Sequence, residues 1–484
     1  MDERPTLNAE PDGPGARHSA CMRDDLIAKN LRPPRIVRPP PKFVSGSLLR
    51  HILVMAGTGG LGLGAIFLGD LANIAFLSWL KDETVVAAVG YASSIMFFTI
   101  SIGIGLSIAA SALVSPAIGA GLTIKARRLS VNAHLATLAA ASLTALVVWL
   151  AVPCLLTIIG ASGSTHAAAT GYLRILVPSL PFVALGMTSS AILRSVGDAR
   201  RAMHVTLWGA VVNTALDPIF IFAFHLGIDG AAIASLLARV VVMIVGLYGV
   251  LRVHDLVARP RLKPLLAGIA PFTAIAVPAI LTNIAAPVSM AYVTSAIAVH
   301  GDSAVAGWAI IGRIMPVAFG AIYALSGSIG PVIGQNYGAG NGDRMRLSLT
   351  LSLAVNVAFT AVAWLLLALL AGPLVDLFHA TGESAALIFL FCRWLAPLFA
   401  FFGALFVSNA AFNTLGRPHY STLLNWGRAT LGTIPLVVAG GALAGASGVL
   451  IGYMLSATLF GVLAVVLCYR TIAELSSRIV DDGC

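Results

Sequence analysis

Long apolar stretches, separated by short polar connections, fill most of this chain. After residue 46 they lie near 50–78, 85–118, 129–160, 168–194, 204–226, 229–251, 265–298, 304–335, 347–378, 385–414, 420–444 and 446–469. As a helix rising ~1.5 Å per residue, each stretch is long enough to cross the ~30 Å hydrocarbon core of a bilayer. The pattern predicts an all-α, polytopic membrane protein with about twelve transmembrane helices.

The composition supports this class and excludes several others. Hydrophobic residues make up 58% of the 484 residues and charged residues 10%, against about 25% charge in a soluble domain. Outer-membrane barrels consist of short alternating strands, which these continuous runs exclude. The sequence has no nucleophile, metal or cofactor motif, and no glycine-rich loop followed by Lys-Ser or Lys-Thr. We therefore expect neither an enzyme nor an ATP-driven pump, and no cofactor.

The net charge is +10, and the basic residues gather in the first 50 residues and at alternate connections. Those at the connections are Lys125, Arg127, Arg128, Arg194, Arg200, Arg201, Arg252, Arg259, Arg261, Lys263, Arg344, Arg346 and Arg417. Cytoplasmic loops carry such an excess, so both termini are predicted to be cytoplasmic. We expect a multi-pass protein of the bacterial inner (plasma) membrane. Nucleic-acid binding is not expected, because no aromatic residues interleave with the basic ones.

The chain contains an internal duplication. The segment 86–121 aligns without gaps on 305–340, with Ile95-Met96 falling on Ile314-Met315. Under the same offset Asp70 falls on Ser289 and Asp217 close to Leu436, so neither acid has an acidic counterpart in the second half. Parallel repeats of this kind build transporters whose halves rock around a central cavity.

The duplication and the composition together predict the domain boundaries. We expect a disordered cytoplasmic tail at 1–46, because its proline- and arginine-rich sequence has too little apolar surface to fold. Two six-helix lobes follow at 47–252 and 265–470, joined by a cytoplasmic loop at 253–264. Residues 471–484 form a second cytoplasmic tail in this prediction.

The run from 204 to 224 holds the strongest candidate for chemistry. Asn213 and Asp217 are four residues apart and share one helix face. An acid at the centre of a membrane helix costs ~2.5–3.5 kcal/mol and is functional by default. Pro218 removes one backbone hydrogen bond and frees the carbonyl of Thr214. Together they predict an oxygen-rich site in an apolar place.

Two further polar residues are expected at about the same depth. Helical rise places Asp70, in the first span, and Ser235, in the sixth, near the level of Asp217. We predict that Asp70, Asn213, Asp217 and Ser235 bind the coupling ion of a transporter. A carboxylate in a low dielectric can bind a proton; alternatively, the four side chains could offer oxygens to sodium.

Structural interpretations of these residues remain open. Asp217 could instead pair with Arg239 as a buried salt bridge. Asn213 could serve as an interhelical hydrogen-bond contact. The hydroxyl of Ser235 could bond to its own helix backbone.

A substrate cavity is expected to use adaptable side chains. The candidates are Tyr91, Met96, Met187, Asn283, Met290, Tyr292 and Arg313. Lipid-facing or packing roles are the alternative for the aromatic residues and methionines, and Arg313 could instead be a paired structural arginine. Kinks are predicted at Pro278, Pro287, Pro316 and Pro397.

Five stretches carry a family resemblance over nearly the whole chain after the tail. They are Gly69-Asp70, Leu193-Arg-Ser-Val-Gly-Asp198, Asn213-Thr-Ala-Leu-Asp217-Pro218, Leu226-Gly-Ile-Asp-Gly230-Ala-Ala-Ile-Ala-Ser235 and Ile333-Gly-Gln335-Asn336-Tyr-Gly338-Ala339-Gly340. With these the chain resembles the multidrug and toxic compound extrusion (MATE) transporters. The resemblance implies a twelve-helix, two-lobed exporter that exchanges organic compounds, often cationic drugs, for protons or sodium.

Within that family the chain looks closest to the DinF-like branch. There an acid in the first helix works with an Asn and an Asp in the fifth and a hydroxyl in the sixth, which match Asp70, Asn213, Asp217 and Ser235. The NorM-like branch uses acids in the seventh and tenth helices. This chain has Asn283 and Ser289 in the seventh and no acid in the tenth, so that mechanism is disfavoured.

The sequence thus predicts a monomeric secondary antiporter for small organic, drug-like cations, coupled to protons or, alternatively, to sodium. A flippase for a lipid-linked oligosaccharide is the first alternative, but it would need a strongly basic cavity for pyrophosphate. A non-transporting membrane scaffold is the second, and it would leave the acids at one depth unexplained.

Overall fold

The computed structural model describes residues 41–80, 83–258 and 262–481, and every regular element within them is a helix. Most of the predicted tail at 1–46 and the basic residues Arg259 and Arg261 lie outside the described residues. The described residues form one compact unit. The prediction of an all-α membrane protein is confirmed.

The helices follow the predicted apolar stretches closely. The first half contains α2 (Leu48–Ser78), α3 (Glu83–Gly119), α4 (Thr123–Ile158), α5 (Gly163–Leu176), η1 (Val177–Ser179), α6 (Leu180–Val196), α7 (Ala199–Pro218), η2 (Ile219–Ala223), α8 (Gly227–Tyr248) and η3 (Gly249–Val253). The second half contains α9 (Leu262–Ala298), α10 (Asp302–Ala318), α11 (Gly320–Gly338), α12 (Gly342–Leu377), α13 (Gly382–Leu390), η4 (Phe391–Leu395), η5 (Ala396–Leu398), α14 (Phe399–Thr414), α15 (Pro418–Gly427), η6 (Arg428–Gly432) and α16 (Thr433–Asp481).

The helices of the described residues can be grouped into twelve candidate membrane spans. In the described part of the chain, ten helical segments are long and apolar enough to cross a membrane, and the bent pair α10–α11 makes an eleventh. The last segment, Pro418–Ile479, is 62 residues long. Ala444 and Gly445 interrupt it with non-helical backbone angles. Dividing it there gives the twelfth span, as the sequence predicts.

The predicted proline kinks have different outcomes. Pro316 lies three residues before Phe319, where α10 and α11 meet at 50°. Pro397 lies in the short η5 turn that separates α13 and η4 from α14. Pro278 and Pro287 lie inside the continuous helix α9, where a kink stays a prediction.

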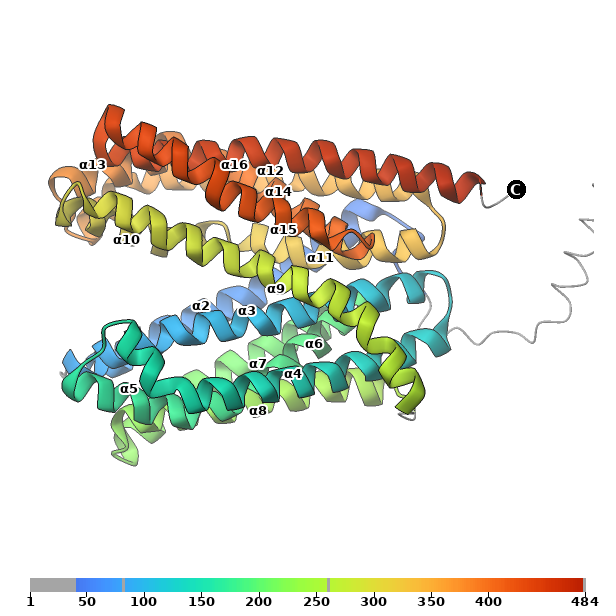
Figure 1. The fold of residues 1–484 in the computed structure, drawn as a ribbon, viewed down its shortest axis with the longest axis horizontal. Helices are drawn as coiled ribbons and strands as arrows, with labels where there is room; N and C mark the ends of the chain where they lie inside the picture. Colours follow the sequence, from blue (N-terminus) through green and yellow to red (C-terminus); the bar gives the residue numbers. More distant parts are fainter. Residues whose placement is uncertain (1–40, 81–82, 259–261, 482–484) are drawn as a thin grey trace, which may run out of the picture. The chain divides into compact units, whose positions relative to one another are not determined.

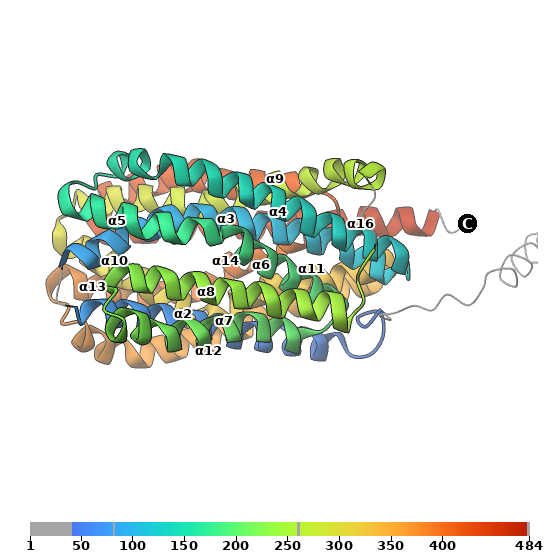
Figure 2. The same ribbon diagram turned by 90° about the horizontal axis from the view of Figure 1, so that it is seen from below.

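The helices of the two halves form two groups that touch along a few helices (Figure 1). The contacts between the halves run mainly through α2 with α11, α3 with α9, and α3 with α11. Figure 2 shows α2 and α7 side by side, with α8 alongside α7, which agrees with their contacts. Helices α2, α7 and α8 therefore lie together in the first half, and they carry the four predicted ion-coupling residues.

Glycines allow the closest helix approaches. A Cβ on Gly338 of α11 would lie 1.9 Å from the Pro116 carbonyl oxygen of α3, and one on Gly119 would lie 1.9 Å from the Gln335 carbonyl oxygen. No other residue type fits such backbone contacts between helices. These two glycines bring the halves together at the end of the helices where the basic connections lie, which we call the basic end.

Candidate ion-coupling site

Asp217 lies at the point where α7 changes its helical geometry. The helix begins after Asp198, whose side chain accepts a hydrogen bond from the Arg201 backbone N–H, and it ends at Pro218. The π-helical turn η2 follows directly, with the Phe224 N–H donating to the Ile219 carbonyl. Pro218 cannot donate to the Thr214 carbonyl, so the α-helical pattern breaks one residue after Asp217. Such π-turns are frequent at functional sites.

The carboxylate of Asp217 is completely buried and only partly satisfied. Its Oδ2 accepts hydrogen bonds from Asn213 Nδ2 at 3.1 Å and from Asn73 Nδ2 at 2.8 Å. Its Oδ1 has no hydrogen-bond partner. A buried acceptor without a partner is costly, and an oxygen of this kind can bind an ion or a proton.

Two glycines of α2 explain how Asn73 reaches Asp217. A Cβ on Gly69 would lie 3.3 Å from the Thr214 hydroxyl oxygen, and one on Gly62 would lie 2.3 Å from the Thr206 hydroxyl oxygen. The face of α2 that carries these glycines therefore packs closely against α7. Asn73 is four residues after Gly69, so it shares that face.

Asp70 lies beside this pair, but its side chain is exposed. It interacts electrostatically with Asp217, with Tyr172 of α5 and with Arg239 of α8. The two carboxylates are thus neighbours, one buried and one accessible, within one polar cluster.

Ser235 contacts the same cluster through a tyrosine. The buried Tyr172 shares a side-chain hydrogen bond with Ser235 and interacts electrostatically with both carboxylates. All four predicted residues thus lie in one cluster, although Ser235 reaches the acids only through Tyr172.

Arg239 has a partner other than Asp217. Its Nη1 donates to the Ser179 hydroxyl at 2.9 Å. No ion pair joins Arg239 to Asp217, and none of the ion pairs among residues 41–80, 83–258 and 262–481 involves either residue. The alternative of a buried salt bridge at Asp217 is therefore not what the structure contains.

Sequence reasoning missed Asn73, Tyr172 and Ser179. Asn73 could have been found, because it follows Asp70 by three residues and so occupies the same helix face. Tyr172 and Ser179 come from α5 and η1, and nothing in their local sequence indicates that they face the acids.

The predicted cavity residues do not gather in one place. Tyr91 and Met96 pack in a core cluster of the first half, whereas Met290 and Tyr292 pack against a cluster of the second half. Met187 lines a small pocket between α3, α4 and α6. Asn283 donates to the Ala279 carbonyl of its own helix, and Arg313 is exposed. Their role in substrate binding stays a prediction.

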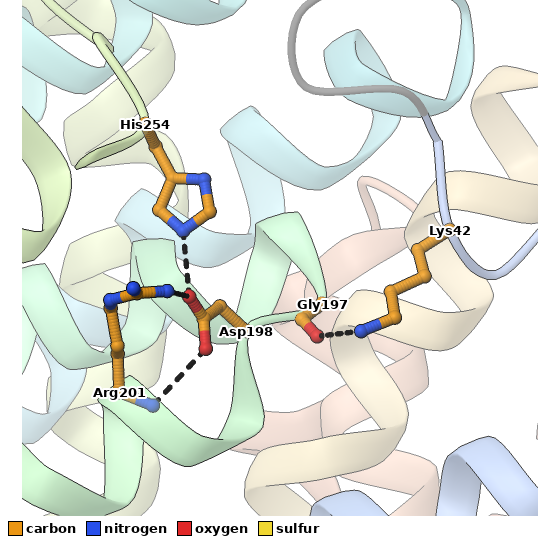
Figure 3. A network of polar contacts seen from close by, with 5 residues as sticks. All are labelled: Lys42, Gly197, Asp198, Arg201 and His254. Carbon is orange, nitrogen blue, oxygen red and sulfur yellow. Dashed lines mark hydrogen bonds and ion pairs between the residues drawn. The ribbon is translucent and has the colours of Figure 1, made fainter.

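A polar network secures the basic end of the first half (Figure 3). Asp198 accepts hydrogen bonds from His254 Nε2 at 2.8 Å and from the backbone and guanidinium of Arg201. Burial raises the pKa of Asp198, but these hydrogen bonds outweigh burial and hold the pKa below its usual range. Lys42 Nζ donates to the carbonyl of Gly197, a residue with φ of +85° that ends α6. This network ties α6, α7 and the segment after α8 together.

Gln335 bridges the two halves at the same end. Its Nε2 donates to the Ser195 carbonyl of α6 at 2.7 Å, and its Oε1 accepts the Phe43 backbone N–H at 2.8 Å. Asn336 and Arg344 both donate to the Phe43 carbonyl. The basic end is therefore closed by direct contacts between the halves.

Comparisons with known proteins agree with this architecture. The MatE family model matches twice, at residues 63–219 and 278–438, one match in each half. The FAD transporter of Shewanella oneidensis is 28% identical over 91% of this chain and 98% of its own length. The multidrug export protein MepA of Staphylococcus haemolyticus is 24% identical over 85% of this chain and 90% of its own length.

A solved structure gives the same result. A crystal structure of a mutant of the Vibrio cholerae MATE transporter VcmN superposes with a TM-score of 0.84 at 26% identity, covering 89% of this chain and 98% of that one. The two family matches together cover well over half of the sequence. The chain therefore belongs to the MatE family of membrane transporters, whose members are not enzymes.

Proposed function

We propose that this protein is a secondary antiporter that exports small organic compounds in exchange for protons, with sodium as the alternative ion. The observation that carries the proposal is the buried carboxylate of Asp217, whose Oδ1 has no partner while two amides hold its Oδ2. A proton or a sodium ion on Oδ1 would satisfy this acceptor and neutralise the charge.

Asp70 gives the ion a route to the buried acid. Its side chain is exposed, whereas that of Asp217 is completely buried. An ion that neutralises one carboxylate removes the repulsion between the two, which changes how α2 and α7 pack. Since α2 also packs against α11 of the other half, such a change can reach the contacts between the halves. For sodium, the oxygens would come from Asp70, Asn213, Asp217 and Ser235.

The substrate is a small organic compound in this proposal, and the two carboxylates favour a cationic, drug-like one. A cation could compete with the coupling ion for the same negative charge. A lipid-linked oligosaccharide flippase is less well supported, because its pyrophosphate would be repelled by the acids of the first half. A scaffold role leaves the unpartnered Asp217 oxygen unexplained.

The test is dye transport in proteoliposomes that contain the full-length protein. With an imposed proton gradient, Asp217→Asn is expected to abolish ethidium movement, whereas Asp302→Asn, at the exposed start of α10, leaves it unchanged. Ethidium transport by Asp217→Asn at the wild-type rate would contradict the proposal. Movement driven by a sodium gradient at equal pH on both sides would select sodium as the coupling ion.

A further inference from the structure

The second half contains a buried arginine, Arg428, that has no hydrogen-bond or ion-pair partner among the described residues. Arg428 stands on the π-helical turn η6, about 15 Å of helical rise from the start of α15. Its side chain is 3% exposed. Its Nε and Nη1 are buried and make no hydrogen bond. No carboxylate pairs with it anywhere in the described parts of the chain.

Two half-buried arginines of the first half each have a hydroxyl partner. Arg194 donates to the Ser190 hydroxyl at 2.9 Å, and Arg239 donates to the Ser179 hydroxyl at 2.9 Å. Arg428 has no such hydrogen bond in the described residues, although Tyr323 and Tyr453 nearby carry hydroxyls, and no carboxylate pairs with it there.

Aromatic rings surround Arg428 instead. Its guanidinium carbon lies 5.0 Å from the ring centre of Phe402 and 5.8 Å from that of Tyr453. Five further rings connect to these two across α10, α11 and α14, and they are Trp308, Phe319, Tyr323, Phe399 and Phe406. We call the five together with Phe402 and Tyr453 the aromatic group.

The aromatic group does not complete the site. Ring faces attract the positive charge of an arginine, but the N–H groups point outward in the plane of the guanidinium and still need acceptors. A carboxylate or a phosphate offers two oxygens at the spacing of two such N–H groups. Arg428 therefore lacks what an anionic ligand would supply.

We propose that Arg428 and the aromatic group form the substrate site of the second half, and that this site takes an anionic oxygen group, carboxylate or phosphate, carried on a planar aromatic compound. The anion binds the edge of the guanidinium, and the aromatic part of the substrate stacks among the surrounding rings. Because Arg428 is almost completely buried here, the site binds substrate only after the helices around η6 move apart.

This assignment rests on the proposed transport function and adds an anionic group to the substrate proposed there. The first half would bind the coupling ion at its acids, and the second half would bind the negative group of the substrate. A compound carrying both a cationic and an anionic group on an aromatic core would match the acids of one half and the arginine of the other.

Paired probes test the assignment with the full-length protein in detergent. Riboflavin and flavin mononucleotide share one ring system and differ by a phosphate, and 2-naphthalenemethanol and 2-naphthoate differ by a carboxylate. The wild-type protein should bind at least one anionic member about tenfold more tightly than its neutral partner, and the pair that responds identifies the anion. Equal binding within both pairs overturns the proposal without the need for a variant.

Two arginine variants sharpen the result. Arg428→Gln should remove the preference for the anionic member and leave binding of the neutral one unchanged. Arg393→Gln is the matched control, because Arg393 is an exposed arginine of the same half that stacks over Phe389 at 4.8 Å. An equal loss of anion binding in both variants would overturn the site.

The two proposals can fail separately. If wild-type protein moves ethidium in an Asp217-dependent way but shows no anion preference, the transport proposal stands and the Arg428 site is wrong. If anion binding depends on Arg428 while no gradient drives any transport, the site stands and the antiport proposal is wrong.

Discussion

The side chains of Asn73 and Asp217 meet at 2.8 Å although 144 residues separate them in the chain. Asn73 comes from α2 and Asp217 from the last turn of α7. Through this contact, an ion or a proton that binds the Asp217 carboxylate would alter the hydrogen bond that holds α2 to α7.

Replacing Asn73 by Ala is expected to slow ethidium transport about tenfold or more. The substitution removes one of two donors to a buried carboxylate, and a hydrogen bond to a charged group contributes about 1.5–3 kcal/mol. Transport rates in proteoliposomes at equal protein content measure the effect. Thr58→Ala on the same helix is the control, since that hydroxyl donates only to its own helix backbone. A wild-type rate in Asn73→Ala would show that this hydrogen bond is dispensable.

Replacing Gly338 by Ala should weaken closure of the basic end. The added Cβ would lie 1.9 Å from the Pro116 carbonyl oxygen, so α3 and α11 must separate, and overpacking of this kind costs ~1–3 kcal/mol. Spin labels at 125 and 346, both exposed, should show a larger population of long distances. Gly312→Ala serves as the control, because a Cβ there meets nothing within 4 Å.

Replacing Gln335 by Leu should also weaken closure of the basic end, because it removes hydrogen bonds. The substitution leaves the Ser195 carbonyl and the Phe43 N–H without their partner. Each unsatisfied buried group costs about 1–3 kcal/mol. We expect faster tryptic cleavage next to Lys42 than in the wild-type protein, measured before global unfolding. Unchanged cleavage would mean that the other contacts of the basic end suffice.

Replacing Asp198 by Asn should lower stability at pH 7 by about 1–2 kcal/mol, because the hydrogen bonds from His254 and Arg201 lose their charged acceptor. Asn is also a good helix N-cap, so the change isolates the charge.

The pH dependence of this effect follows from the direction of the pKa shift. The pKa of Asp198 in the folded protein lies below its ordinary value of 3.8. The stabilisation is therefore complete above about pH 4 and is lost as the pH falls below that value. Thermal unfolding at pH 7 and at pH 3 should show a gap between wild type and variant that narrows at pH 3. A constant gap would assign the effect to something other than the charge.

The sequence was sufficient for the membrane spans and for the local part of the site. Hydrophobic length alone predicts the spans, and the four-residue spacing of Asn213 and Asp217 predicts their contact, because both depend on one helix. The contacts of Asn73, Tyr172 and Ser179 depend on how α2, α5 and η1 pack against α7 and α8, which spacing does not encode.

Helix packing also explains why sequence spacing could not locate the substrate residues or single out Arg428. Tyr91, Met96, Met290 and Tyr292 have suitable side chains, but their helices direct them into two separate core clusters. Arg428 is one arginine among several in the spans, and only the structure distinguishes it by the missing partner of its Nε and Nη1.

The short segment before α2 has a mechanical consequence. Lys42 bonds to Gly197 of the first half, whereas Phe43 is held by Gln335, Asn336 and Arg344 of the second. The helix that carries Asp70 and Asn73 is thus anchored at its start to the opposite half. When the basic end opens, this anchor must either let go or pull on α2. In the proposed antiporter, the start of α2 would therefore couple separation of the two halves to ion binding at Asp70 and Asp217.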